Sequence, residues 1–407
     1  MSLEFAEALD WATGHRTGQD IKVSLSLLKN HVLIVGGSGS GKTHLAKAML
    51  EQTLLAGVPT IAIDSQGDLL WLTRVKPGNS AEKRALRTIP KKIFTPDYSD
   101  GFPFVIAPVL YSTTAENNRS PIRYWVRTVL RAIGYELKPG QTSPEEYQLT
   151  RTSESILNNS PQLSLKELVE KSREQSAAWT IDKTAPLRSE DTQVLVSRLG
   201  ALLGIEEKLY VGKPFCVKDL GTSANGFWII YLVPLPIETR QLIINWVCEA
   251  VYDWMMNVPA VNLNRPRLIL FIDEAADYVT QSSPPELRQG LFRLLNQGRK
   301  YGVGLILAAQ TPQGLPPEVT NNCKMKFYGA LDDPGDLSLV KRSTGLVDIF
   351  PLRHGSWRHA FLASIPGTKA AYCRAHSLLT RNGKPLALKS SGMERILRLL
   401  HQFRPQR

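Results

Sequence analysis

The chain has few cysteines and no long apolar run. Its 407 residues include four cysteines, none of them in a paired spacing, which excludes a zinc ribbon or a disulfide framework and is typical of a reducing compartment. The longest apolar run, residues 227–237, has 11 residues with two prolines and is too short to cross a bilayer. The first residues carry acids and lack a basic-then-apolar signal pattern. We therefore expect a soluble, cytoplasmic protein without a membrane segment.

Acidic residues are in the minority. The chain has 37 Asp and Glu residues but 49 Lys and Arg residues, which gives a net charge of +12 and a pI of about 9.5. Such a balance favours a polyanionic partner such as nucleic acid, although a solvated basic surface has the same composition. Two stretches concentrate the positive charge, residues 74–92 and 381–407. The eight tryptophans are scattered among apolar patterns, and we interpret them as core residues.

One short stretch, GGSGSGKT at residues 36–43, carries a specific chemical signal. It fits G-x-x-x-x-G-K-[ST], follows the apolar run 31–35 and precedes a helical pattern over 43–57. Glycines let such a loop curl so that its N–H groups point at phosphate oxygens, and the following helix adds its positive dipole end. Lysine then binds the β- and γ-phosphates and the hydroxyl binds Mg²⁺. The predicted nucleotide-binding residues are Gly36, Gly37, Ser38, Gly39, Ser40, Gly41, Lys42, Thr43 and His44, with Thr43 as a metal ligand.

Apolar runs and helical patterns alternate along the chain in the order β-α-β … β-α-β-α-β. This order predicts an α/β fold with a doubly wound, mainly parallel sheet. A largely helical stretch interrupts it between residues 105 and 220. Strands are expected at residues 31–35, 59–64, 91–97, 225–233, 268–275, 305–311 and 359–365. Helices are expected at residues 43–57, 122–135, 163–179, 238–256, 285–300 and 393–403.

Two adjacent acids, Asp273 and Glu274, end the strand predicted at 268–275. Ligands of doubly wound sheets bind at the carboxyl ends of the strands, so these acids should share an edge with the glycine-rich loop. Asp273 would hold Mg²⁺, and Glu274 would orient and deprotonate an attacking water. A surface acid pair that opens a loop is the alternative. The glutamate favours hydrolysis over transfer to a small-molecule acceptor, which needs no water-activating base.

Two further residues suggest roles in hydrolysis. Gln310 ends the run 305–311, and its amide could sense the γ-phosphate or position water; a polar strand cap is the alternative. Arg299, at the end of a helical pattern, is a candidate arginine finger for a neighbouring subunit. An arginine there could equally pair with the helix dipole.

With GGSGSGKT, IAIDSQGD (61–68), FIDEA (271–275) and RKYGVGLILAAQT (299–311) in this order, the chain resembles the HerA/FtsK superfamily of P-loop ATPases, and within it the HerA-like branch. The matching segments span roughly residues 31–330. The resemblance implies a RecA-like ATPase core, ATP and Mg²⁺ as cofactors, and hexameric rings that thread double-stranded DNA. By position it makes Lys42, Glu274, Gln310 and the trans-acting Arg299 catalytic, and Thr43 and Asp273 metal ligands. Asp64 and Asp68 match the family's acidic motif without a clear chemical role.

HerA-type proteins carry an N-terminal β-barrel that helps to assemble the ring and to dock a nuclease. Here only about 30 residues precede the first expected strand, so we expect the barrel to be absent. We predict an N-terminal extension (1–30), a RecA-like core in two parts (31–104 and 221–345), a mostly helical insertion (105–220) and a C-terminal strand with a basic helical tail (346–407).

The function that these features favour is an ATP-driven ring motor that translocates double-stranded DNA. The alternative is a regulatory NTPase that assembles or switches a partner effector such as a nuclease. A small-molecule kinase is disfavoured by Glu274, by Gln310 and by the lack of an obvious lid.

Overall fold

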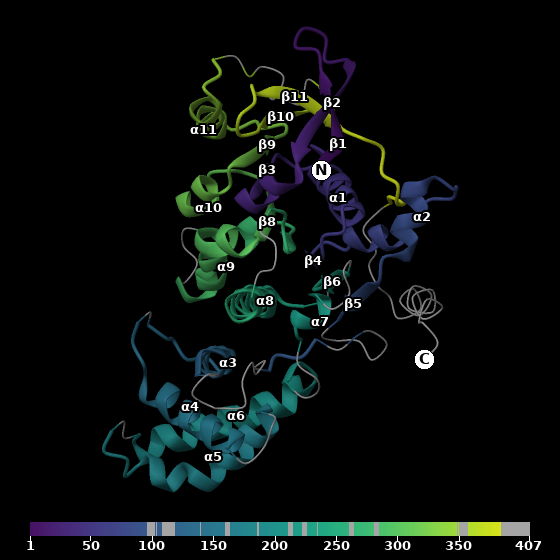
Figure 1. Ribbon diagram of the computed structural model, residues 1–407. Coiled ribbons are helices and arrows are strands. Elements are labelled where there is room, and N and C mark those ends of the chain that lie inside the picture. Colours follow the sequence, from purple (N-terminus) through teal and green to yellow (C-terminus); the bar gives the residue numbers. More distant parts are fainter. Residues whose placement is uncertain are drawn as a thin grey trace.

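Eleven strands form a single sheet in the part of the chain that the structure describes, in the order β2-β1-β11-β10-β9-β3-β8-β7-β4-β6-β5 (Figure 1). The structure, a computed structural model, describes all residues except 96–101, 103, 108–118, 139, 159–162, 185–186, 211–214, 222–225, 234, 260–263, 281–284, 348, 350–356 and 384–407. The strands are β1 (Ser2–Leu9), β2 (Arg16–Ser24), β3 (Val32–Val35), β4 (Thr60–Asp64), β5 (Lys91–Phe94), β6 (Phe227–Tyr231), β7 (Leu268–Ile272), β8 (Val303–Ala309), β9 (Met325–Tyr328), β10 (Phe361–Ser364) and β11 (Ala371–Ala375).

Strand β8 lies between the strand that precedes the glycine-rich loop and the strand that precedes the two acids. It pairs in parallel with β3, where Ala309 is opposite Val35, and with β7, where Leu307 is opposite Ile272. All strands from β9 to β5 in the sheet order run parallel. Their carboxyl ends therefore meet at one edge, and the doubly wound, mainly parallel α/β sheet is confirmed.

Apolar side chains cover both faces of the parallel strands. Successive residues of a strand point to opposite faces. In β3, Leu33 and Val35 belong to one core cluster, whereas Val32 and Ile34 belong to the other. Strands β4, β7 and β8 are buried along their whole length. Unbroken apolar runs of this kind are characteristic of parallel strands with helices on both sides.

Helices cover the two faces. The helices α1 (Lys42–Leu55) and α2 (Ala81–Thr88) pack into one core cluster, and α8 (Ile237–Asn257) and α9 (Pro285–Gln297) into the other. A short 3₁₀ helix, η5 (Gly298–Tyr301), continues α9 toward β8. The helices α10 (Pro317–Asn322) and α11 (Pro334–Thr344) flank β9.

A group of helices lies beyond α8, away from the sheet (Figure 1). Of this group, α3 contacts α8 directly. The group follows β5 in the chain and precedes β6, in the region where a helical stretch was predicted. That the group is an insertion at residues 105–220 stays a prediction. Its members are α3 (Arg119–Ala132), α4 (Pro144–Leu157), α5 (Leu165–Trp179) and α6 (Ser189–Tyr210), followed by the short α7 (Lys218–Gly221).

Four antiparallel strands extend the sheet beyond β9, and they correct the expectations for both ends of the chain. β1 and β2 lie within the first 30 residues, where no strand was predicted, and β1 pairs with β11. The acids of β1 obscured its pattern, although Leu3 and Phe5 alternate toward the core. β9 and β11 were also missed, whereas the strand predicted at 359–365 corresponds to β10.

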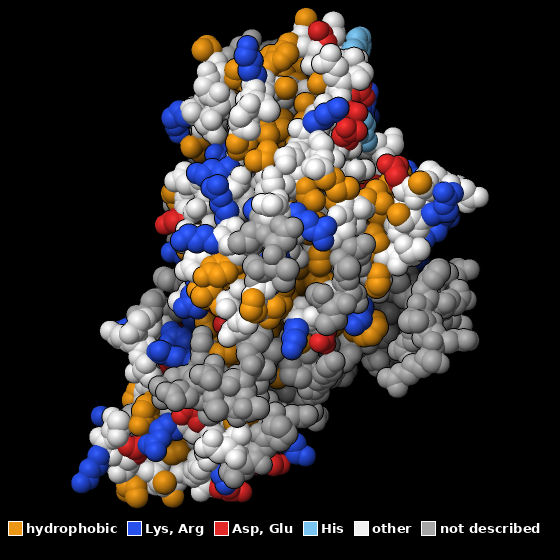
Figure 2. Space-filling model, in the orientation of Figure 1, with side chains coloured by type: hydrophobic (Ala, Val, Ile, Leu, Met, Phe, Trp, Pro, Cys, Tyr) orange, Lys and Arg blue, Asp and Glu red, His pale blue; other side chains and the backbone are white. Residues whose placement is uncertain are grey.

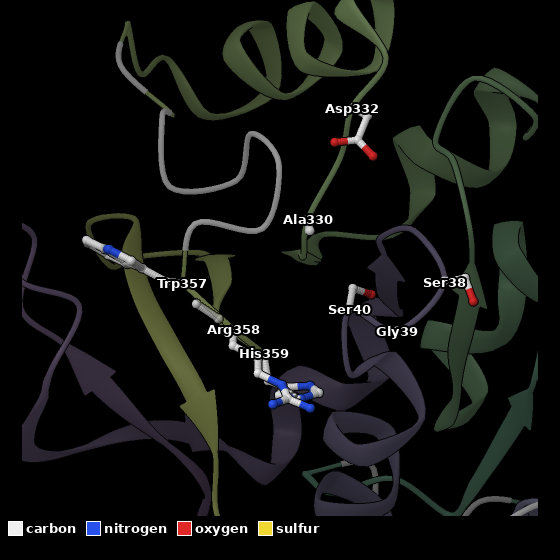
Figure 3. A pocket seen from close by; sticks show the side chains of 9 residues that line it. Ser38, Gly39, Ser40, Ala330, Asp332, Trp357, Arg358 and His359 are labelled. Atoms are coloured by element: carbon white, nitrogen blue, oxygen red, sulfur yellow. Dashed lines mark hydrogen bonds between the residues drawn. The ribbon is translucent and has the colours of Figure 1, made fainter.

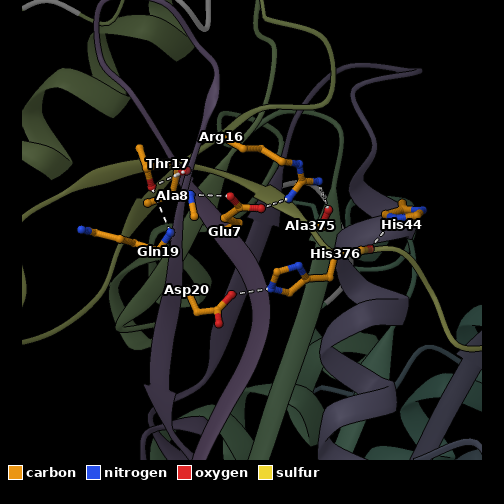
Figure 4. Close-up of polar contacts among 10 residues, drawn as sticks. Glu7, Ala8, Arg16, Thr17, Gln19, Asp20, His44, Ala375 and His376 are labelled. Carbon is orange, nitrogen blue, oxygen red and sulfur yellow. Dashed lines mark hydrogen bonds and ion pairs between the residues drawn. The ribbon is translucent and has the colours of Figure 1, made fainter. Parts of the chain in front are cut away.

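Polar contacts join this N-terminal hairpin to β11 and α1 (Figure 4). Arg16 Nη2 donates to the carbonyl of Ala375 over 2.8 Å, and His376 Nε2 lies 2.8 Å from Asp20 Oδ1. The carbonyl of His376 is in turn 2.9 Å from His44 Nε2. A chain of contacts therefore runs from the hairpin to the first turn of α1, beside the glycine-rich loop.

Other expectations have mixed outcomes. The helix predicted at 393–403 and nearly all of the basic stretch 381–407 lie outside the described residues. None of the four cysteines forms a disulfide. Among the described residues no helix combines the length and the apolar content that a bilayer crossing requires. Most tryptophans are buried as expected, but Trp11 is 48% exposed and Trp357 lines a pocket.

His31 fixes the start of β3. The backbone N–H of Leu305 donates to Nδ1 over 3.1 Å, so Nε2 carries the proton and donates to the carbonyl of Leu295 over 3.1 Å. Burial lowers the pKa of His31 to about 4, which keeps the ring neutral. One imidazole thus ties β3 to β8 and α9, at the amino ends of the strands.

Glu51 on α1 holds the segment that follows β11. Its side chain is buried and accepts hydrogen bonds from the N–H groups of Leu379 and Thr380, each over 2.8 Å, and from Thr380 Oγ1 over 2.6 Å. Lys47, one turn earlier, donates to Asn382 Oδ1 over 3.0 Å. The segment 376–382 therefore runs along the helix that begins at the glycine-rich loop.

Replacing Glu51 by glutamine should lower the free energy of unfolding by about 2 kcal/mol. The amide would place its own N–H group against groups that donate hydrogen bonds to the carboxylate, and at least one of these bonds would be lost. Urea denaturation measures the change. Glu170→Gln, at an exposed position on α5, is the matched control and should change stability by less than about 0.5 kcal/mol. Equal losses in the two variants would contradict the anchoring role of Glu51.

Candidate nucleotide-binding site

The glycine-rich loop turns sharply between β3 and α1. Gly39 and Gly41 have φ values of 74° and 96°, in the left-handed region that other residues rarely adopt. The N–H of Gly37 donates to the carbonyl of Ala330 over 2.8 Å, which holds the base of the loop against the chain that follows β9. The loop geometry therefore depends on its glycines and on a neighbouring strand.

Lys42 is the first residue of α1, and its ammonium group lies against the loop. Nζ donates to the carbonyls of Gly36 over 2.6 Å and Gly37 over 3.3 Å. Burial lowers the pKa of Lys42, whereas the carboxylates of Glu274 and Asp273 raise it. The structure thus brings Lys42 together with both acids, as the sequence predicted.

Asp273 follows β7 and is 4% exposed. Burial, together with the nearby carboxylates of Asp64 and Glu274, raises its pKa to about 7. Its Oδ2 atom is buried and accepts no hydrogen bond. Buried carboxylate oxygens without a partner are rare in proteins, and this one is free to coordinate a cation.

Glu274 has an unusual backbone. Its φ of 53° lies in the left-handed region, which costs a non-glycine residue about 1 kcal/mol or more. The side chain is 8% exposed, and its Oε1 accepts a hydrogen bond from the backbone N–H of Gln310 over 3.1 Å. This left-handed turn ends β7 and keeps both acids at the carboxyl edge.

The acidic motif after β4 has a role that the sequence did not reveal. Asp64 is fully buried and accepts hydrogen bonds from the N–H groups of Gly67 over 2.7 Å and Leu69 over 3.0 Å. It therefore folds the turn that carries Asp68. Burial raises the pKa of Asp68, and the ammonium group of Lys47 opposes that shift.

The other two predicted catalytic residues lie at opposite ends of β8. Gln310 follows the strand and is exposed beside the loop. Arg299 precedes it and lies close enough to His31 to lower the pKa of that ring. The 7 residues of β8 span about 23 Å, so Arg299 is far from the loop of its own chain.

The other residues that were predicted to contact the nucleotide lie in different surroundings. Thr43 is half-buried in the first turn of α1, next to Lys42. Ser40 is buried, and its hydroxyl has no hydrogen-bond partner. The ring of His44 lies against the carbonyl of His376, so its predicted contact with a nucleotide stays a prediction.

A pocket beside the loop contains residues that the sequence analysis missed. It has a volume of about 370 Å³ (Figure 3). Ser38, Gly39 and Ser40 form one wall, and Trp357, Arg358 and His359 approach from the start of β10. Trp357, Arg358 and His359 lie far from the loop in the sequence, so the motif of the loop does not include them.

The basic stretch 74–92 is largely engaged in local contacts. Lys76 Nζ donates to the carbonyl of Leu378 over 2.7 Å, and Arg87 Nη2 donates to the carbonyls of Lys76 and Gly78 over 2.9 and 2.7 Å. On the face drawn in Figure 2, Lys and Arg side chains are scattered rather than gathered in a stripe. The described contacts favour a structural role for this stretch.

The residues present fit a nucleotide with Mg²⁺. The ammonium group of Lys42 already binds carbonyl oxygens at the place where phosphate oxygens would bind. The unpartnered Oδ2 of Asp273 and the hydroxyl of Thr43 are oxygen ligands of the type that Mg²⁺ prefers. Glu274 lies next to them with its carboxylate held by Gln310.

Comparison with known proteins identifies related sequences. The family model described as "Helicase HerA, central domain" matches residues 12–251, more than half of the chain. Two probable helicases of Methanocaldococcus jannaschii are 25% identical over 119 residues and 28% identical over 96 residues, or 28% and 24% of this chain. The matched regions span only 23% and 18% of those relatives.

Solved structures share the fold. VirB4 of Thermoanaerobacter pseudethanolicus has a TM-score of 0.61 at 17% identity, covering 92% of this chain and 96% of that one. The bacterial conjugative coupling protein TrwBΔN70, in its unbound form, also has a TM-score of 0.61, at 13% identity and with 94% and 90% covered. The plasmid coupling protein TrwB in complex with ADP and Mg²⁺ has a TM-score of 0.57 at 15% identity, with 95% and 97% covered. The predicted P-loop ATPase fold is therefore confirmed.

Replacing Asp273 by asparagine should change how stability depends on pH in the nucleotide-free protein. The folded wild type retains a proton on Asp273 up to a pH of about 7, whereas an unfolded aspartate loses it near 4. Between these values the folded state binds more protons, so this group makes the wild type less stable as the pH rises. The variant lacks that contribution.

Urea denaturation with a chelator, at several values between pH 5 and 8, measures this effect. The stability of Asp273→Asn relative to the wild type should rise by about 2 kcal/mol or more across this range. Asp191→Asn, at an exposed position on α6, is the matched control. A constant difference between Asp273→Asn and the wild type would show that Asp273 is not buried beside other carboxylates.

Proposed function

The chain belongs to the family of the HerA helicase central domain, and we propose that it is the ATP-hydrolysing subunit of a ring that translocates double-stranded DNA. The observation that carries the proposal is the meeting of Lys42, Asp273 and Glu274 at one edge of the sheet. A phosphate-binding lysine, a metal-binding carboxylate and a water-activating carboxylate together form a hydrolytic site.

Each residue has a defined task in this proposal. Lys42 would exchange the loop carbonyls for the phosphates, and Thr43 and Asp273 would hold Mg²⁺, which would neutralise charge on the transferring phosphoryl group. Glu274 accepts a proton from the attacking water. Its pKa is raised by burial, which makes it a stronger base than an exposed glutamate. Gln310, next to the loop, positions the water or senses the γ-phosphate.

Arg299 supports a ring in particular. Arg299 lies at the amino end of β8, at the opposite edge of the sheet from the glycine-rich loop of its own chain. If Arg299 takes part in hydrolysis, its position and its exposure direct it to the site of another subunit. A closed ring, which we infer to be a hexamer, gives every site an arginine from its neighbour.

DNA is the partner that the charge and the relatives favour. The net charge of +12 suits a polyanion, and scattered Lys and Arg residues suit contacts with phosphates rather than with bases. The family model bears the name of a helicase, and structural neighbours include a conjugative coupling protein. In this proposal the chain consists of a RecA-like core with a helical insertion at 105–220.

Duplex DNA should stimulate the ATPase activity of the purified protein. Raising the salt from about 50 to 200 mM should suppress the stimulation, because a protein that contacts six or more phosphates loses roughly 10³-fold in affinity over this range. Phosphate release is measured with and without DNA. Lys42→Ala and Glu274→Gln should abolish hydrolysis, and Glu274→Gln should still bind ATP.

Other outcomes separate the alternatives. A rate that neither duplex nor salt changes would contradict the motor. Stimulation by a co-purifying protein in place of DNA would indicate a regulatory NTPase that switches an effector such as a nuclease. Transfer of phosphate to a small acceptor would indicate a kinase.

Arg299→Ala should lower kcat by roughly 10³-fold or more, which is the usual contribution of an arginine finger. Because one arginine serves a neighbouring site, adding variant subunits to the wild type should reduce activity more steeply than their fraction. Lys300→Ala, at the next exposed position, is the matched control. A loss in strict proportion to the fraction of variant subunits would argue for a purely structural Arg299.

A further inference from the structure

One face of α8 carries polar side chains that meet α9. Asn245, Glu249 and Tyr252 lie at positions i, i+4 and i+7 of α8, so they share one face of that helix. The contacts are Gly290 N–H to Asn245 Oδ1, Arg293 Nη1 to Glu249 Oε2 and Tyr252 Oη to Gln297 Oε1, each over 3.3 Å. These three contacts, which we call the polar ladder, follow the same order along both helices.

The middle contact of the polar ladder is buried and charged. Glu249 is 1% exposed and also accepts a hydrogen bond from the hydroxyl of Tyr124 on α3. The guanidinium group of Arg293 lies over the ring of Tyr124, 5.2 Å from its centroid. Burial raises the pKa of Glu249 to about 8, and the charge of Arg293 opposes this shift. One carboxylate therefore joins three helices, and α8 lies between α9 and α3 (Figure 1).

The polar ladder fixes where α9 lies along α8. A Cβ atom on Gly290 would come within 2.9 Å of Cys248 Cβ, so the two helices approach too closely for a side chain at this position. Hydrogen bonds require a narrow range of distances and angles, whereas apolar contacts have no direction. A buried ion pair adds little net stability, because desolvation offsets the attraction, and its best-attested role is to fix the register of packed helices.

The helix that the polar ladder holds leads directly to Arg299. Gln297, in the last contact of the ladder, ends α9, and η5 with Arg299 follows at once. Six residues separate Arg293 from Arg299, which is about 9 Å along a helix axis. A Cβ atom on Gly298 would come within 3.0 Å of the carbonyl of Val303, so η5 packs tightly against the start of β8. A displacement of α9 would therefore displace Arg299 as well.

We propose that Glu249 and the other residues of the polar ladder are positioning residues, which hold α9 so that Arg299 meets the nucleotide site of the neighbouring subunit. The inference rests on the proposed function, because it needs Arg299 to act on another subunit. It goes beyond that function by assigning a role to α8. In this proposal α8 determines how well a subunit serves the site of its neighbour.

Two variants that complement each other measure the arginine that one subunit supplies to another. Arg299→Ala keeps its own hydrolytic residues but supplies no arginine, whereas Lys42→Ala cannot hydrolyse ATP but still supplies one. Each variant alone should be nearly inactive. Their mixture should regain ATPase activity at the Arg299→Ala sites that have a Lys42→Ala neighbour. Phosphate release by this mixture is the reference.

Glu249→Gln is then added to one or the other member of the pair. On the Lys42→Ala subunits, which supply the arginine, it should lower the regained kcat by about tenfold or more, because a misplacement of about 1 Å costs up to roughly 10²-fold. On the Arg299→Ala subunits, which supply none, it should leave the regained kcat unchanged. Both mixtures contain the same amount of Glu249→Gln, so a loss of stability would lower their activities equally.

A milder variant and a control complete the experiment. Tyr252→Phe removes one hydroxyl from the last contact of the ladder and leaves no charge unpaired, so it should fold. It should lower the regained kcat by a smaller factor, again only on the Lys42→Ala subunits. Glu238→Gln, at an exposed position on the same helix, is the matched control and should change neither mixture.

Every other pattern overturns the assignment. Equal losses in the two mixtures, or a larger loss on the Arg299→Ala subunits, would show that Glu249 acts on stability or on its own site. Unchanged activity in both mixtures would show that the ladder does not position Arg299. If the pair without Glu249→Gln regains no activity, even with Glu274→Gln in place of Lys42→Ala, then Arg299 does not act on a neighbour. The ring of the proposed function would then fail together with this inference.

Discussion

The parallel pairing of β8 with both β3 and β7 is the constraint on which the site depends. Because the three strands run in the same direction and are paired residue by residue, the loop after Val35 and the acids after Ile272 must emerge at one edge. Ligand groups separated by more than two hundred residues are thereby brought close enough for Lys42 to respond to Glu274 and Asp273. A shift of one residue in either ladder would turn buried side chains to the opposite face.

This edge concentrates negative charge that the protein only partly neutralises. Asp64, Asp68, Asp273 and Glu274 all have pKa values raised first by burial. Asp64 at least receives backbone hydrogen bonds, whereas Oδ2 of Asp273 receives none. Desolvated carboxylates destabilise a fold unless a cation or a proton joins them. The arrangement therefore costs folding stability, and a divalent cation bound at this edge would offset that cost.

The sequence predicted the sheet and the two acids because their signals are local. β4, β7 and β8 are unbroken apolar runs, and the glycine-rich loop is a contiguous motif. β1 escaped prediction because its alternation of buried and exposed residues breaks between Glu4 and Glu7, where its register with β2 shifts, and because its pairing with β2 and β11 is not visible in the sequence. The pocket residues escaped for a different reason. Arg358 and His359 become neighbours of Gly41 only through the antiparallel strands beyond β9, and no short motif records such a contact.

Those antiparallel strands also bring distant parts of the chain into contact with α1. The hairpin supports Trp357, whose neighbour His359 packs on Gly41. Glu51 and Lys47 hold the segment 376–382 from the same helix. The helix that begins at the glycine-rich loop therefore has contacts at its first turn and along its length with the two ends of the described chain. A displacement of α1 would therefore have to break or move the contacts of the hairpin and of the segment after β11.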